Sequence, residues 1–142
     1  MISPQTRRQA GILLVVLPMV SYGGAGLLYL LNHDPRYAQN HLRQDLWRAG
    51  HAHAGVLLLL SLVTLLYLDD TTLSARAKTF VRISVPMSAI LLPAAFFFSV
   101  LTPDATKPNA MIHLAYLGAL ELAAGLVVLG VGLIRKNTES PT

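Results

Sequence analysis

The sequence predicts an all-α polytopic membrane protein, a four-helix transmembrane bundle with a short outer interfacial helix. Hydrophobic residues make up 54% of the 142 residues and charged residues only 13%, and the mean hydropathy is +0.53. Soluble domains carry about 25% charged residues. Four apolar stretches, each near the roughly twenty residues that cross a hydrocarbon core, take up well over half of the chain. We therefore expect one transmembrane domain, 1–142, in contact with the lipid bilayer.

The expected spans are, in chain order, about 10–31, 51–68, 80–101 and 110–134. Arg7 and Arg8 precede the first stretch, as they would precede a cleaved signal segment, but its apolar length up to Leu31 favours a retained span. The first span holds a cluster of glycines and the third holds Pro86 and Pro93. These residues predict kinks and close contacts between helices.

The polar segment 32–50 predicts the interfacial helix, at about 35–48. Asp34 and Pro35 form a helix-start signal, and no breaker follows before Gly50. We expect the apolar side chains to face lipid or the bundle, with Trp47 as an interfacial anchor, and the polar ones to face water. The apolar set is Tyr37, Leu42, Leu46 and Trp47, and the polar set is His41, Arg43 and Asp45.

The distribution of Lys and Arg predicts the orientation. Seven lie on the side that carries the termini: Arg7, Arg8, Arg76, Lys78, Arg82, Arg135 and Lys136. Four lie on the other side: Arg36, Arg43, Arg48 and Lys107. The positive-inside rule then predicts a multi-pass protein of the cell membrane with both termini in the cytoplasm. The net charge of +4 is explained by this topology and needs no nucleic-acid partner.

Histidines and one acid mark the candidate site. His53 opens the second span and His113 opens the fourth, so we expect them at similar shallow depth, facing one another across the bundle. Glu121 lies about 12 Å deeper than His113 by helix rise. A carboxyl group at that depth needs a partner, water or a proton. Ser61 and Thr64 are the expected partners by depth.

Three functional interpretations follow. In the first, His53 and His113 are axial ligands of haem b, and Arg48 or Arg43 pairs with its propionates. In the second, copper or another divalent metal binds to a set formed by His51, His53, His113 and Met111. The roughly 200° between His51 and His53 on a regular helix weakens this set. In the third, the histidines and Glu121 form a proton or ion relay, as in a small coupled transporter.

A purely structural interpretation stays open beside them. In it, His51 and His53 cap a helix end, His113 bonds to a neighbouring backbone, Glu121 is a satisfied buried acid, and no cofactor binds. A structural or accessory subunit of a larger membrane complex, or a homo-oligomer, could use the glycine-rich faces of the first and fourth spans. No nucleophile–base pair, phosphate loop or nucleotide fingerprint occurs, so an enzymatic function has little support.

Two stretches carry a resemblance. "LWRAGHAHAGVLLLLSL" and "LLPAAFFFSVLTPDATKPNAMIHLAYLGALELAAGL" resemble a family of small bacterial four-helix integral membrane proteins without an assigned activity. The short "HAHAG" at 51–55 is similar to the histidine-rich helix starts of haem-copper-type and nitric-oxide-response membrane proteins. That similarity implies a cofactor-ligand role for His51 and His53 only, because the other histidine helices of those families are absent from this chain.

Overall fold

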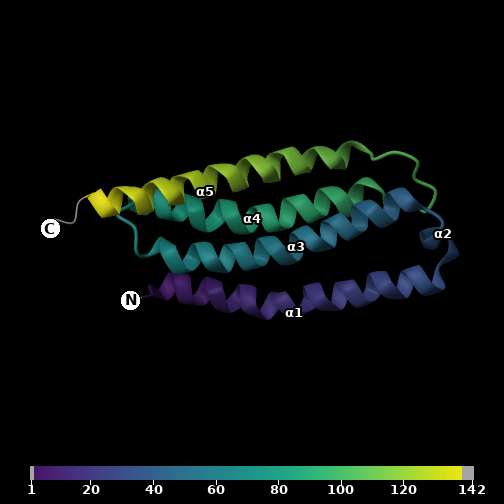
Figure 1. Cartoon of the computed structure of the whole chain (residues 1–142), viewed down its shortest axis with the longest axis horizontal. Helices are drawn as coiled ribbons and strands as arrows, with labels where there is room; N and C mark the ends of the chain where they lie inside the picture. Colours follow the sequence, from purple (N-terminus) through teal and green to yellow (C-terminus); the bar gives the residue numbers. More distant parts are fainter. Residues whose placement is uncertain (1, 139–142) are drawn as a thin grey trace.

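The computed structural model describes the backbone of residues 2–138 and the side chains of residues 2–135. Residues 1 and 139–142 of the predicted domain therefore lie outside the described part, as does the side chain of Lys136. The elements are α1 (Pro4–His33), α2 (Pro35–Ala38), α3 (His41–Leu68), α4 (Ala75–Ser99), a 3-10 turn η1 (Ala110–His113) and α5 (Leu114–Thr138). All are helical, and α1, α3, α4 and α5 form a bundle (Figure 1).

Within residues 2–138, four helices are long and apolar enough to cross a membrane, which confirms the predicted fold class. The chain is a multi-pass integral membrane protein. Figure 1 shows the start of α1 and the end of α5 at one end of the bundle, called here the terminal end. The opposite end carries α2 and the connection 100–109, and is called the α2 end.

The four long helices pack in chain order and not as a closed square. α4 lies between α3 and α5, with long contacts to both, and α3 and α5 touch only briefly. The backbone of α1 contacts only α2 and α3 among the described elements. In the most apolar 18-residue stretch of α1 only 6% of the residues are buried, against 44% in the corresponding stretch of α4. α1 is therefore a peripheral helix on an α3–α4–α5 core, as Figure 1 shows.

Three glycines of α5, spaced by seven residues, allow its close contact with the core. A Cβ at Gly118 would lie 3.2 Å from the backbone nitrogen of Leu92, and one at Gly125 would lie 2.5 Å from Ser84 Oγ. A Cβ at Gly132 would lie 2.5 Å from Leu73. These glycines face inward, so this face of α5 is not free for a partner protein. Gly11, Gly26 and Gly130 have open space around them, and the accessory-subunit interpretation stays a prediction.

The expected interfacial helix at about 35–48 is not a separate element. α2 begins at Pro35 as predicted, with Asp34 accepting from the backbone N–H of Arg36, but it ends after one turn. Asn40 then adopts an extended conformation, and its side chain accepts from the N–H of Arg43 and caps α3. α3 continues through Gly50 without a break. Gly50 has no room for a Cβ because the Phe97 ring lies 2.9 Å from that position.

Arg43 turns inward, contrary to expectation, whereas Trp47 faces the bundle, one of the two directions expected for it. Arg43, expected in water, is 6% exposed, and its guanidinium lies 4.4 Å from the Trp47 ring. Trp47, expected as an interfacial anchor, packs on Phe97, and its Nε1–H donates to the Phe97 carbonyl at 3.1 Å. Both contacts exist because the first two turns of α3 lie against the end of α4. The carbonyl acceptors and the Trp47 ring that Arg43 meets here outweigh the preference of an arginine side chain for water.

The carboxyl end of α4 explains why these side chains are needed. A helix ends with carbonyls that have no partner within the helix, and burying them unpaired is costly. Here each has a donor: Trp47 for Phe97, the Asn109 side chain for Phe98, the Asn109 N–H for Ser99, and Arg43 for both Val100 and Leu101. The α2 end is thus fixed to α4 by hydrogen bonds as well as by apolar packing.

At the terminal end, one ion pair joins α1, α3 and α4. Arg82 donates to Asp69 Oδ1 at 2.7 Å and to the hydroxyls of Thr6 and Ser3, and the Ser3 N–H donates to Asp69 Oδ2 at 2.8 Å. Burial works to raise the pKa of Asp69, but the hydrogen bonds from Ser3 and Thr6 and the charge of Arg82 together lower it below the usual aspartate value. We call Ser3, Thr6, Asp69 and Arg82 the anchor cluster.

A further contact of α1 with α4 depends on Pro86. Proline has no N–H, so the carbonyl four residues earlier, that of Arg82, loses its partner within α4. The Gln9 side chain donates to this carbonyl at 2.6 Å. The carbonyl that Pro86 leaves without a helical partner thus holds α1 against α4.

The glycine contact can be tested with a matched pair of variants. Gly125→Val places a side chain where Ser84 and Val85 already lie, so we expect a loss of about 1–3 kcal/mol, measured as a lower Tm in detergent. Gly130→Val adds the same side chain where nothing lies within 4 Å, and its Tm should stay near that of wild type. Equal losses in the two variants would show that the α4–α5 contact is looser than described.

The anchor cluster predicts a pH dependence. The folded-state pKa of Asp69 is lowered, so the ionised carboxylate stabilises the fold above the unfolded-state pKa of about 3.9, and this is lost as the pH falls through the folded-state pKa. We expect the Tm difference between wild type and Asp69→Asn to be largest near pH 7 and to shrink below about pH 4. Thermal unfolding followed by circular dichroism measures it. A difference that is constant from pH 7 to pH 3 would contradict the assignment.

Candidate functional site

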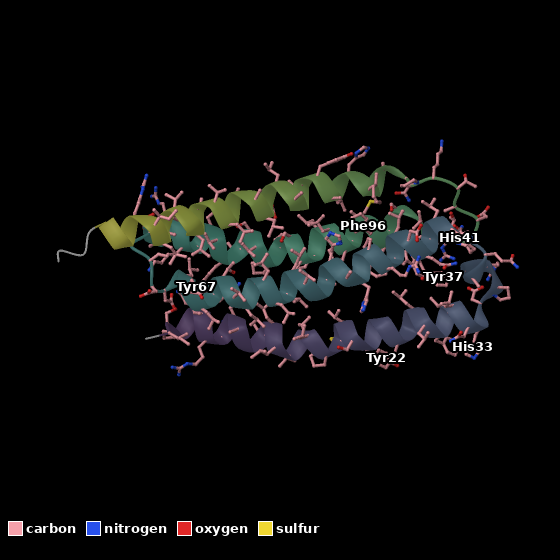
Figure 2. All side chains as sticks on the ribbon, in the orientation of Figure 1. Tyr22, His33, Tyr37, His41, Tyr67 and Phe96 are labelled. Carbon is pink, nitrogen blue, oxygen red and sulfur yellow. The ribbon has the colours of Figure 1, made fainter. Side chains whose placement is uncertain are left out.

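All five histidines gather toward the α2 end, as expected from their positions in the chain. Figure 2 shows His33 at the end of α1 and His41 at the start of α3, with Tyr67 at the far end of the molecule. His51 and His53 follow within the third turn and start of the fourth turn of α3, and His113 ends η1. The histidines share this end because of the order of the helices, but their rings face different directions.

His53 faces α4. Its ring is half-buried, with its centroid 5.1 Å from that of Phe96, a residue labelled in Figure 2. Nδ1 lies 2.7 Å from the Ala49 carbonyl. A carbonyl only accepts, so Nδ1 carries the hydrogen and, in the neutral ring, the lone pair is left on Nε2. This is the arrangement that histidine ligands of metals commonly show.

His113 does not face into the bundle. It is exposed, and its ring stacks on that of Tyr116 with centroids 5.8 Å apart, and Tyr116 is itself 73% exposed. The physical reason is the packing order, because α4 separates α3 from most of α5. The structure therefore does not bring His53 and His113 together in the interior, as the bis-histidine haem prediction requires.

The residues expected to hold a metal are also dispersed. His51 faces α1 while His53 faces α4, as the 200° rotation between them predicts. Met111 is 41% exposed on η1. Among residues 2–138, no group of three or more His, Cys, Asp or Glu side chains is close enough to hold a metal ion. A copper or other divalent site stays a prediction without a ligand set.

The two arginines expected near the haem propionates have other partners. Arg43 donates to the carbonyls at the end of α4. Arg48 pairs with Asp45 at 2.5 Å on the exposed face of α3. It also lines a hollow beside His51 and keeps further N–H groups free to donate.

The most distinctive feature is the position of His51 between α1 and α3. Its Nε2 lies 2.8 Å from where a Cβ of Gly24 would stand, so only glycine leaves room for the ring. Hollows of about 260 and 340 Å³ flank it, one toward α2 and one deeper along the two helices. We call these two hollows together the α1–α3 crevice.

The α1–α3 crevice is apolar along its walls and polar at the α2 end. Leu27, Leu28 and Leu31 of α1 form one wall, and Leu17, Val20, Val56 and Leu59 line the deeper part. Tyr37, Gln44, Arg48 and His51 supply the polar groups. The Gln44 amide already donates to the carbonyls of Tyr37 and Ala38. His51 makes no hydrogen bond with any residue that the structure describes.

Burial and two arginines act on the Tyr37 hydroxyl in opposite directions. Burial raises the pKa of Tyr37, and the charges of Arg48 and Arg43 oppose this without cancelling it. The phenol therefore stays neutral at physiological pH. The positive charge near the polar end of the crevice comes from the buried Arg43, which has no carboxylate partner among the described residues, and from Arg48.

Glu121 lies midway along the contact between α4 and α5. Gly118 and Gly125, one turn on either side, contact Leu92 and Ser84, which places Glu121 near the level of Ser88. Its Oε2 is buried and has no hydrogen-bond partner among the described residues, and Ser84 Oγ is in the same state. Ser61 and Thr64, the expected partners, donate to carbonyls of their own helix, those of Leu57 and Ser61.

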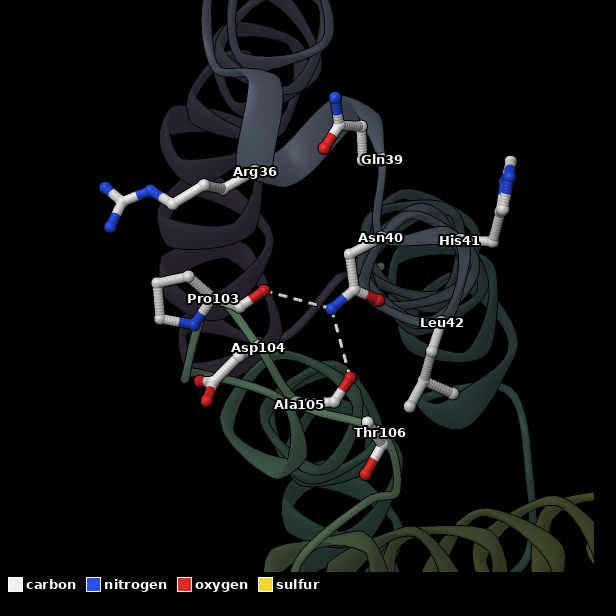
Figure 3. A pocket seen from close by; sticks show the side chains of 9 residues that line it. All are labelled: Arg36, Gln39, Asn40, His41, Leu42, Pro103, Asp104, Ala105 and Thr106. Carbon is white, nitrogen blue, oxygen red and sulfur yellow. Dashed lines mark hydrogen bonds between the residues drawn. The ribbon is translucent and has the colours of Figure 1, made fainter.

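A third hollow lies on the exposed α2 end, where Asn40 joins two connections. Its Nδ2 donates to the carbonyls of Pro103 and Ala105, each at 3.0 Å (Figure 3). The hollow measures about 550 Å³, and Arg36, His41 and Asp104 lie around its rim. In Figure 3, Arg36 and Asp104 extend to one side and His41 extends to the other, so these three side chains do not converge on the hollow.

Comparison of the chain with protein-family models, curated proteins and solved structures found no match. The resemblance to small bacterial four-helix membrane proteins and to haem-copper-type helix starts therefore stays a prediction. The sequence analysis also missed the role of Gly24 opposite His51. Gly24 lies nine residues before the end of α1, and His51 lies ten residues after the start of α3. Because the two helices are antiparallel neighbours, these similar distances from the connection could have predicted that the two residues lie opposite each other.

Proposed function

We propose that the protein binds a lipid-soluble molecule with a polar head in the α1–α3 crevice, with His51 bonded to the head. The supporting observation is the His51 imidazole, half-buried between two hollows and without a hydrogen bond to any described residue. A polar group in apolar surroundings costs free energy unless it is paired. A bound ligand would pair it.

The available groups indicate the chemistry of the head. Arg48 offers N–H donors beyond the one held by Asp45, and a neutral imidazole offers one donor and one acceptor. The side-chain amide nitrogen of Gln44 already donates to two backbone carbonyls, so Gln44 has no donor left for a ligand. A head with acceptor oxygens, a carbonyl or a carboxylate, fits this set. The apolar walls suit a hydrocarbon tail.

The route of entry is lateral. Near the crevice the backbone of α1 lies beside only α2 and α3, and just 6% of its most apolar stretch is buried, so the crevice is bordered by one loosely packed helix and opens toward the bilayer. We also infer from the Lys and Arg distribution that the α2 end faces outward and both termini are cytoplasmic. The crevice then lies in the outer half of the membrane.

Haem b or metal binding remains a second-ranked prediction for the same end of the molecule. The free Nε2 of His53 favours a ligand role for that residue alone. His113 and Met111, both exposed, supply no second ligand inside the bundle in this conformation.

Glu121 supports a different candidate function, proton binding in a proton- or ion-coupled transporter. An ionised carboxylate deep in a span requires a partner, and none of the described residues donates to Oε2. A proton on the carboxyl, or a water shared with Ser84 Oγ, would satisfy it.

Trp47 gives a direct test of ligand binding, because it is the only tryptophan and its ring lies 5.5 Å from that of Tyr37 on the crevice wall. Titration of the detergent-purified protein with a short-chain benzoquinone or with palmitate should change its fluorescence in a saturable way. His51→Leu should weaken the Kd about tenfold, the loss of roughly one hydrogen bond to a polar head. Gly24→Leu should abolish saturation by displacing the ring.

The matched control is His33→Leu, an exposed histidine stacked on Tyr29 outside the crevice, which should bind as wild type does. Saturation by one probe only identifies the head as a carbonyl or an acid. Equal binding in wild type and His51→Leu, or no saturation by either probe, would overturn the proposal. A Soret band that is lost in both His53→Ala and His113→Ala would replace it by the haem interpretation.

Carbodiimide labelling tests the Glu121 candidate. Dicyclohexylcarbodiimide partitions into membranes and adds to protonated carboxyl groups in apolar surroundings. We expect a mass adduct on the peptide that contains Glu121 and none in Glu121→Gln. Proton uptake into vesicles that contain this variant should also be lost. Asp70, exposed at the terminal end, is the internal control and should remain unmodified. An unlabelled Glu121 at every pH would rule out this role.

A further inference from the structure

The contact between α1 and α3 opens a second time, at the terminal end. There a hollow of about 490 Å³ has walls formed by Leu14 of α1 and Leu62, Leu65 and Leu66 of α3, with Gly11 also lining it and the exposed Arg7 at its mouth. We name it the terminal groove. We propose that it holds an acyl chain of an anionic phospholipid from the adjoining leaflet, with the lipid phosphate on Arg7.

The walls select a hydrocarbon chain. Nearly all of the surface that lines the groove is apolar, and Leu14 and Leu66 are more than half exposed. A Cβ at Gly11, one of the lining residues, would have no atom within 4 Å, so no neighbouring helix fills the space beside it. In a bilayer such a hollow is occupied by lipid, because an empty void forfeits dispersion contacts on every wall.

The charge at the mouth selects an anionic head. Arg7 makes no ion pair with any residue that the structure describes, whereas the nearby Arg82 is held by Asp69 in the anchor cluster. Because Ser3 and Thr6 are fixed in that cluster, the first turns of α1 are held in place and Arg7 stays beside the groove. A phosphate accepts strong charge-assisted hydrogen bonds from a guanidinium.

Other occupants fit less well. A second copy of the chain would bring another Arg7 and Arg8 to the same place, and like charges would oppose each other. A free phosphate would use Arg7 but leave the apolar walls uncovered. A phospholipid satisfies the cation and the walls together. Arg8, Arg76 and Lys78 add positive charge at this end, and Asp69 is already paired.

The test uses the full-length protein in detergent, titrated with dioleoyl phosphatidylglycerol and, separately, with dioleoyl phosphatidylcholine. Binding is read by native mass spectrometry and by the rise in Tm. We expect wild type to prefer the glycerol lipid, and Arg7→Gln to weaken its Kd about fivefold and remove the preference. Gly11→Leu should weaken the binding of both lipids, because the leucine side chain would occupy space that the acyl chain needs.

Two matched variants serve as controls. Arg8→Gln removes the neighbouring charge, which does not line the groove, and Gly26→Leu adds a leucine at another open position of α1. Both should bind lipid as wild type does. An equal loss in Arg8→Gln and Arg7→Gln would show diffuse charge attraction and overturn the site. So would stabilisation by inorganic phosphate alone, or a dimer that Gly11→Leu dissociates.

The proposals for the terminal groove and for the α1–α3 crevice can be tested independently. His51→Leu lies at the other end of α3 and should leave lipid binding unchanged, and Arg7→Gln should leave the Trp47 signal with quinone or palmitate unchanged.

Discussion

The packing of α4 between α3 and α5 decides which polar groups of this protein can meet. Glycines at 118 and 125 bring α5 onto α4, and Gly50 brings α3 onto the rings at the other edge of α4. With both of its long neighbours in contact, α4 separates the histidines of α3 from that of α5. The order of packing therefore gives three of the histidines different neighbours: a backbone carbonyl for His53, a tyrosine ring for His113 and a glycine opposite His51.

In a membrane, helices gain little from burying apolar side chains against one another, because lipid is equally apolar. Polar contacts and close backbone approach therefore hold the bundle. α1 shows this clearly. Its apolar face is almost entirely exposed, yet it is joined to α4 by the anchor cluster and by Gln9, which bonds to the carbonyl that Pro86 leaves free. Fixed near its amino end and loosely packed beyond it, α1 borders hollows on α3.

Two arginines that face other helices follow one rule at opposite ends of the molecule. Arg43 and Arg82 each donate to several acceptors, carbonyls at the end of α4 in one case and Asp69 with two hydroxyls in the other. Arg7 and Arg48 lack such enclosure and border the two openings between α1 and α3. Arg7 makes no ion pair with a described residue, and Arg48 keeps N–H donors beyond the one on Asp45, so both arginines can donate to the ligands proposed for these openings.

The sequence by itself determined the spans, because an apolar stretch of about twenty residues has few alternatives to a helix that crosses the bilayer. It also determined that the histidines share one end and that His51 and His53 point apart, since helix periodicity is a local property. Only the tertiary structure decided that α4 stands between His53 and His113, that Arg43 is buried, and that Asn40 divides the segment expected as one interfacial helix. These outcomes depend on which helices are neighbours and on the donors that the end of α4 requires, and neither is encoded in the pattern of a single segment.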